Sequence, residues 1–180
     1  MKIIGVTNRK LCKNFYERIS EIAKSNLDYL ILREKDLNYN ELLDMACKVK
    51  DVLKESDIKL IINSNIYVAT KIEAFGVQVS FDYFREKGKE FKRGITGVSI
   101  HSLNEAIKAE KLGADYLLYG HVFKTECKKD LEPRGLKELE EINKIVKIPL
   151  YAIGGINCSN YKEVLKTGVE GIAVMSSLMK

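Results

Sequence analysis

The segment YLLYGHV, residues 116–122, shows the pattern that decides the fold. An apolar run ends at a glycine, and a histidine and charged residues follow it directly. A continuous apolar run is typical of a strand that is buried on both faces. Seven further runs of this kind occur along the chain: KIIGVTN (2–8), YLILRE (29–34), KLIINS (59–64), GVQVS (76–80), GITGVSI (94–100), PLYAIGG (149–155) and GIAVMS (171–176).

Amphipathic stretches that predict helices separate these runs. SLNEAIKAEKLG begins with a capping-box pattern, Ser102 with Glu105, and ends at Gly113. Strands that alternate with helices indicate a parallel sheet with right-handed crossovers. Eight strands are the number that closes a (β/α)₈ barrel, and 180 residues suit one domain. We therefore predict an α/β protein, a small (β/α)₈ TIM barrel, with residues 1–180 as a single domain.

The competing architecture is a doubly wound open sheet. No GxGxxG or P-loop pattern follows the first run, which lowers that option. The chain stops at SSLMK directly after the eighth run, so the eighth helix is expected to be essentially missing. The flank between the first and seventh helices would then expose apolar surface. We expect either a second copy of the chain, giving a homodimer, to cover it, or a truncated chain.

Composition excludes several classes of protein. No apolar run approaches the roughly 20 residues that cross a bilayer, and the N-terminus lacks the features of a signal peptide. We expect a cytoplasmic protein with no membrane contact. The net charge is +5, but no basic stretch is interleaved with aromatic residues, so we expect no nucleic-acid partner. The four cysteines form no CxxC pair, which argues against a zinc site or a disulfide framework.

Residues at the carboxyl ends of the predicted strands are candidates for the functional site, because barrel sites form there. Cations and hydroxyl groups dominate this set and carboxylates are few, which favours an anionic ligand. The set comprises Asn8, Arg9, Arg33, Glu34, Lys35, Asn63, Ser64, Ser80, Asp82, Ser99, His101, His121, Thr125, Lys128, Gly154, Gly155, Ser176 and Ser177.

The last two strands carry a phosphate-binding pattern. Gly154 and Gly155 let backbone N–H groups approach an oxygen-rich ligand without obstruction by side chains. Ser176 and Ser177 add N–H and hydroxyl donors where a helix would begin. Barrels commonly bind phosphate after strands seven and eight. The alternative is that the two glycines form only a tight turn.

Two other positions at the predicted mouth carry charge. Arg33 and Lys35 flank Glu34, and alternate residues of a strand share a face, so both cations can point into the mouth. The alternative is that Glu34 pairs with one of them or with another basic residue. His121 can take and give a proton near pH 7, which suits general acid–base catalysis. His101 lies beside a helix cap and receives no role, and Cys127 at most lines the site.

The segments that carry a family resemblance are, in this order, LREKD, IINS, GVQVS, GVSIHS, GADYLLYGHVFKT, IPLYAIGGI and GVEGIAVMSS. With them the chain resembles the thiamin phosphate synthase/TenI superfamily. The resemblance implies a (β/α)₈ barrel that binds a thiazole phosphate. Its synthase branch joins a pyrimidine diphosphate to the thiazole phosphate and needs Mg²⁺. The synthase pattern is incomplete here. Its Asn-Asp pair is Asn63-Ser64 in this chain, and its acidic GQxD motif corresponds to residues 80–83, with Tyr83 in the place of the metal-binding acid. The glutamine of its strand-two motif is Ile31, and its loop of hydroxyl residues and a lysine corresponds to residues 125–128.

The TenI branch tautomerises a thiazole without a metal, and its hallmark GHVFET reads GHVFKT here, with Lys124 for the glutamate. The resemblance therefore implies a thiazole tautomerase, an isomerase of the carboxythiazole phosphate of thiamin biosynthesis, with His121 as the proton shuttle and no cofactor. The expected substrate and phosphate contacts, with no metal ligand among them, are Arg33, Lys35, Asn63, Ser99, Thr125, Lys128, Gly154, Gly155, Met175, Ser176 and Ser177.

Other functions stay open. A thiamin phosphate synthase, a transferase, would need Asp82 or the substrate diphosphate to hold Mg²⁺. A non-catalytic protein could bind thiazole phosphate and regulate a partner. More distant phosphate-binding barrel isomerases would act on sugar phosphates.

Overall fold

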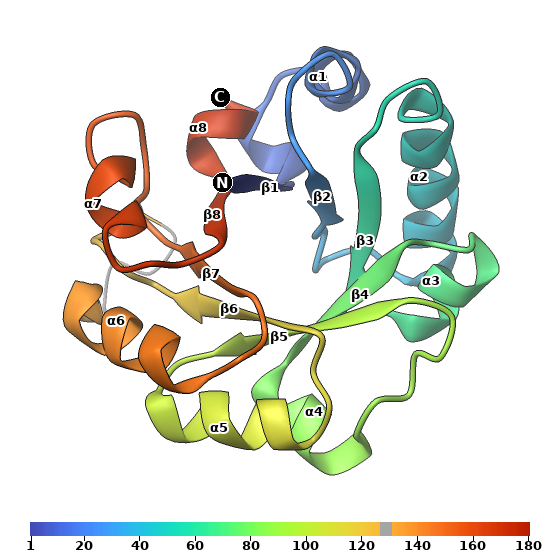
Figure 1. The fold of residues 1–180 in the computed structure, drawn as a ribbon. Coiled ribbons are helices and arrows are strands. Elements are labelled where there is room, and N and C mark those ends of the chain that lie inside the picture. Colours follow the sequence, from blue (N-terminus) through green and yellow to red (C-terminus); the bar gives the residue numbers. More distant parts are fainter. Residues whose placement is uncertain (127–130) are drawn as a thin grey trace.

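The computed structural model describes residues 1–126 and 131–180, which form a closed barrel of eight parallel strands (Figure 1). Each strand pairs with its neighbours in sequence, and β1 also pairs with β8, which closes the sheet. The strands are β1 Lys2–Val6, β2 Tyr29–Leu32, β3 Lys59–Asn63, β4 Gly76–Ser80, β5 Ile95–Ile100, β6 Tyr116–Gly120, β7 Leu150–Ile153 and β8 Gly171–Val174. The predicted (β/α)₈ barrel is confirmed.

Helices follow the strands and form the outer layer (Figure 1). They are the 3₁₀ helix η1 Arg9–Leu11, then α1 Phe15–Ile22, α2 Tyr39–Val52, α3 Ile66–Lys71, α4 Phe81–Lys87, α5 Leu103–Lys111, α6 Gly135–Ile145, α7 Tyr161–Leu165 and α8 Ser176–Met179. None of these helices has the length and apolar character that crossing a bilayer requires.

The strands bury both faces, as their apolar runs predicted, because successive side chains point to opposite sides. In β2, Leu30 and Leu32 pack outward against the helices, whereas Ile31 points into the barrel. The interior cluster is small and includes Tyr116 and Tyr151, whose rings meet edge to face at 5.6 Å. Because these large side chains fill the interior, the functional pocket can open only at an end of the barrel.

Side-chain caps start several helices, and one of them differs from its predicted form. The Ser102 hydroxyl accepts from the N–H of Glu105 at 3.2 Å, as a capping box requires. The Glu105 carboxylate, however, accepts from the N–H of His101 at 2.6 Å rather than from that of Ser102. The complete capping box is found instead at Asn38 and Glu41 of α2. Glu105 therefore holds the backbone at the end of β5, beside the pocket.

The eighth helix is a single turn, close to its expected absence. Met179 of α8 is fully buried, and α8 contacts η1, which follows the carboxyl end of β1. Within the described parts of α1, α7 and α8, no large hydrophobic side chain is exposed. The expectation of an exposed apolar flank is therefore wrong, because the short helix already covers the gap. The homodimer stays a prediction.

Candidate active site

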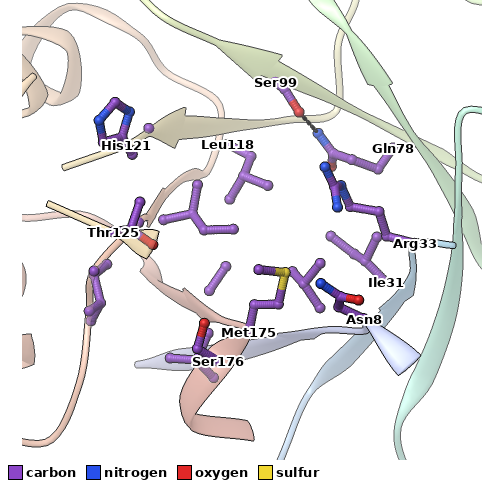
Figure 2. Close-up of a pocket in the computed structure, with 18 of the residues that line it drawn as sticks. Asn8, Ile31, Arg33, Gln78, Ser99, Leu118, His121, Thr125, Met175 and Ser176 are labelled. Carbon is purple, nitrogen blue, oxygen red and sulfur yellow. Dashed lines mark hydrogen bonds between the residues drawn. The ribbon is translucent and has the colours of Figure 1, made fainter. Parts of the chain in front are cut away.

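The carboxyl ends of the strands surround a pocket of about 780 Å³ (Figure 2). Ile31, Leu118 and Ala173 give it an apolar floor, and polar side chains form its rim. The sequence predicted this location; Lys128, and Cys127 as a possible lining residue, lie outside the residues that the structure describes. The other eleven line the pocket together: Arg33, Lys35, Asn63, Ser99, His121, Thr125, Gly154, Gly155, Met175, Ser176 and Ser177.

Arg33 and Lys35 follow β2 and line one side of the pocket. Across the described parts of the chain, neither side chain has a hydrogen-bond or ion-pair partner. The guanidinium of Arg33 holds the pKa of Lys35 below its ordinary value, and partial burial acts in the same direction. Two unpaired cations that repel one another form a ready site for a multivalent anion.

Glu34 lies between these cations in sequence but points away from the pocket into the wall. Its carboxylate accepts from the Thr7 hydroxyl at 2.7 Å, from the Arg9 N–H at 3.0 and 3.1 Å, and from the Arg9 guanidinium at 3.1 Å. The ion pair weighed for Glu34 is therefore made with Arg9, 25 residues away, rather than with its neighbours. Among the described residues, Arg33 and Lys35 have no such partner and remain available to a ligand.

Gly154 and Gly155 follow β7 with φ angles of 106° and 67°, which residues other than glycine rarely adopt. A Cβ at Gly154 would lie 2.3 Å from the Cβ of His121, and one at Gly155 would lie 2.5 Å from the Lys124 carbonyl oxygen. The turn therefore brings two loops into contact as well as opening space for an anion.

Ser176 and Ser177 open α8 beside this turn, and N–H groups in a first helical turn have no partner within the helix. Because α8 has four residues, little of the expected helix dipole is available. The backbone N–H groups and hydroxyl groups remain as donors to a phosphate.

His121 is buried, with only 4% of its surface exposed. Its Nε2 lies 3.2 Å from the Leu131 carbonyl oxygen, and its Nδ1 is buried without a partner among the described residues. Figure 2 shows the ring at the edge of the drawn side chains, turned away from Leu118 and Met175. An imidazole held in this way is a wall residue, and the geometry offers little support for a proton shuttle.

Two wall residues had no role in the sequence analysis. Gln78 of β4 is buried, and its side-chain amide donates to the Ser99 hydroxyl at 2.9 Å (Figure 2). Its position between two valines in the apolar strand GVQVS was a usable signal. The Nδ1 of His101 lies 2.6 Å from the carbonyl oxygen of Gly120, so the end of β5 is tied to the end of β6.

The described residues do not fit a resident Mg²⁺ ion. Within residues 1–126 and 131–180, no group of three or more His, Cys, Asp or Glu side chains could hold a metal. Asp82 is outside the pocket lining and pairs with Arg85 at 3.2 Å, while Tyr83 donates its hydroxyl to Glu90. Ser64 accepts from the Asn63 amide at 2.9 Å. Hard carboxylate oxygens, which Mg²⁺ prefers, are therefore lacking at the two expected positions.

Comparison with known proteins decides the family. The model of the family described as "Thiamine monophosphate synthase", TMP-TENI, matches residues 3–178. The chain belongs to the TMP-TENI family. A thiamine-phosphate synthase of Clostridium acetobutylicum is 39% identical, over 99% of this chain and 87% of the relative. One from Pyrococcus furiosus has the same identity and coverage.

Solved structures agree with this family membership. The thiamine phosphate pyrophosphorylase from Pyrococcus furiosus superposes with a TM-score of 0.86 at 36% identity, over 99% of this chain and 87% of that one. A 3-hexulose-6-phosphate synthase, at 16% identity and a TM-score of 0.71, shares the fold alone.

The superfamily resemblance is thus confirmed, but the predicted function of thiazole tautomerase is wrong. Relatives that are 37–39% identical over nearly the full chain are named thiamine-phosphate synthase, which contradicts the isomerase assignment and the placement beside TenI. The error came from GHVFKT, whose histidine decided the prediction although its ring nitrogens are turned into the wall.

Proposed function

We propose that the protein is a thiamine-phosphate synthase, a transferase that joins a pyrimidine diphosphate to a thiazole phosphate and releases pyrophosphate. The observation that carries this proposal is a pocket with two separate sets of anion-binding groups. Arg33 and Lys35 follow β2, whereas Gly155 and Ser176 follow β7 and β8. Coupling of a diphosphate to a phosphate needs two such sets, and relatives that are 37–39% identical over nearly the full chain are named thiamine-phosphate synthase.

In this assignment the diphosphate binds at Arg33 and Lys35, and the thiazole phosphate binds at the glycine turn and Ser176. The bond between the pyrimidine methylene carbon and the diphosphate oxygen breaks, and the electron pair leaves with pyrophosphate. The lone pair of the thiazole nitrogen forms the new bond to the methylene carbon. Arg33 and Lys35 stabilise the charge that grows on the leaving group. This exchange of bonds needs no proton shuttle, which is consistent with a buried His121.

No step of this proposal passes through a metal, because the described residues offer no carboxylate set for one. Any Mg²⁺ that the reaction needs would have to arrive on the diphosphate.

The test supplies the purified protein with both substrates and measures thiamine phosphate and pyrophosphate in parallel, with added Mg²⁺ and with EDTA. We expect both products in equal amounts and neither product when one substrate is omitted. Arg33→Met should lower kcat/KM by about 100-fold, a typical loss for one charged contact to a leaving group. The absence of coupling in every buffer would refute the proposal.

A further inference from the structure

The buried carboxylate of Glu34 has no part in the reaction proposed above, yet it is among the most constrained groups in the structure. Its side chain is 2% exposed, whereas that of Asp36, two residues later, is 43% exposed. Both pair with Arg9: Glu34 inside the wall and Asp36 on the surface, at 2.7 and 2.9 Å. A buried charge of this kind is retained only where its hydrogen bonds are complete.

The hydrogen bonds of Glu34 end at the cation pair. Thr7, which is fully buried, donates its hydroxyl to Glu34 and accepts from the backbone N–H of Arg33 at 2.9 Å. Glu34 therefore fixes the backbone of the segment that carries Arg33 and Lys35 against the end of β1. Glu34 is anchored in the wall, and its two neighbours in sequence, Arg33 and Lys35, both line the pocket.

This anchoring works against electrostatic repulsion. Arg33 and Lys35 line the same side of the pocket without a partner among the described residues, so their charges favour separation. Rigid backbone hydrogen bonds are the means by which a site holds like charges together before a ligand arrives.

We propose that Glu34 is a positioning residue, which acts through Thr7 and Arg9 to hold Arg33 and Lys35 in the geometry that binds the diphosphate. The inference rests on the proposed function, in which this cation pair receives the diphosphate.

The sign of one mutational effect separates positioning from simple electrostatics. Glu34→Gln removes a negative charge near an anion site, which by charge alone strengthens anion binding. The amide, however, has one acceptor oxygen in place of two, so it cannot keep all the hydrogen bonds that Thr7 and Arg9 donate, and the anchor weakens. Positioning predicts weaker binding. Asp36→Asn is the matched control, since it removes the same charge from the same segment and the same arginine but at the surface.

The experiment titrates inorganic pyrophosphate, and separately thiazole phosphate, into each variant by calorimetry and records the melting temperature of each. We expect Glu34→Gln to weaken pyrophosphate binding by about tenfold or more, the scale of a misplaced binding group. Thiazole phosphate binding should stay within about twofold, and Asp36→Asn should leave both ligands nearly unchanged. Thr7→Val should reproduce the loss of pyrophosphate binding, whereas Thr7→Ser should bind pyrophosphate like the wild type. This pair of variants tests the anchor even if Glu34→Gln folds poorly.

The outcomes divide clearly. Unchanged or tighter pyrophosphate binding in both Glu34→Gln and Thr7→Val would overturn the inference and leave the proposed function intact. Equal weakening of both ligands, with a lower melting temperature, would also overturn it, because a general loss of structure does not choose between subsites. A wild-type protein that does not bind pyrophosphate at all would refute the proposed function and this inference together.

Discussion

Replacement of Gly155 by alanine tests the phosphate site at the end of β7. The residue has a φ of 67°, and a Cβ there would lie 2.5 Å from the Lys124 carbonyl oxygen and 2.8 Å from the Cβ of Phe123. The left-handed conformation costs an L-residue about 1–2 kcal/mol. Overpacking against a neighbouring backbone costs about 1–3 kcal/mol more. The variant should therefore lose about 2–5 kcal/mol of stability, unless the turn moves away.

Either response is measurable. For a domain of this size each kcal/mol shifts the melting temperature by about 2–4 °C, so a rigid turn predicts a fall of roughly 4–20 °C. A turn that moves instead retracts the N–H groups from the phosphate, and the dissociation constant for thiazole phosphate should rise by about tenfold or more. Calorimetric titration and thermal unfolding of the same sample distinguish the two responses.

Gly113→Ala is the control. Gly113 also has a left-handed φ, 88°, but a Cβ there would meet no atom within 4 Å, and the residue lies at the end of α5, outside the pocket lining. The Gly113→Ala variant should lose about 1–2 kcal/mol of stability and bind ligands like the wild type. If Gly155→Ala melts like Gly113→Ala and binds thiazole phosphate like the wild type, the close approach has no role and the reasoning is refuted.

Three further predictions concern other parts of the site. His121→Ala should destabilise the protein by about 2–4 kcal/mol, as a buried large-to-small change does. The rate of coupling, measured well below the melting temperature, should fall by less than about tenfold. A loss greater than the ~10²-fold that a true acid–base group contributes would contradict this. Because Arg33 lowers the pKa of Lys35, pyrophosphate affinity should be full below that pKa and decline as pH rises through it, earlier than for an ordinary lysine. Lys35→Arg should keep its affinity at alkaline pH, and identical pH profiles for the two proteins would count against the explanation. Gly97→Ala should lower the melting temperature by roughly 5–10 °C, because the new Cβ would lie 2.0 Å from the ring of Tyr116. Adding Tyr116→Val to the same chain should recover part of this loss. If nothing is recovered, the ring is not the obstacle.

The barrel and the place of its site were predictable because they depend on local patterns. Continuous apolar runs mark strands buried on both faces, and the residue that follows each run must lie at the mouth. Arg33 and Gly155 were found in this way. Contacts between distant segments were not predictable. Neither the pairing of Glu34 with Arg9 nor the carbonyl of Leu131 beside His121 leaves a mark in the local sequence.

The predicted function, which relatives named thiamine-phosphate synthase contradict, rested on one histidine whose contacts the sequence did not show. GHVFKT placed a histidine at the end of a strand, but only the folded chain shows that its ring nitrogens are buried. Gln78 was missed for the opposite reason, since a polar residue within an apolar strand was treated as part of the strand.

The charges of Arg33 and Lys35, which have no partner among the described residues, also affect how fast a substrate arrives. Clefts that carry charge of one sign raise the rate of encounter with oppositely charged ligands, often by one to three orders of magnitude at low salt. At physiological ionic strength, charges further apart than about 8 Å are largely screened from one another. The pocket should therefore capture a diphosphate quickly in dilute buffer and more slowly as salt is added. Release depends on short-range contacts and should change much less, so added salt acts mainly on the association rate.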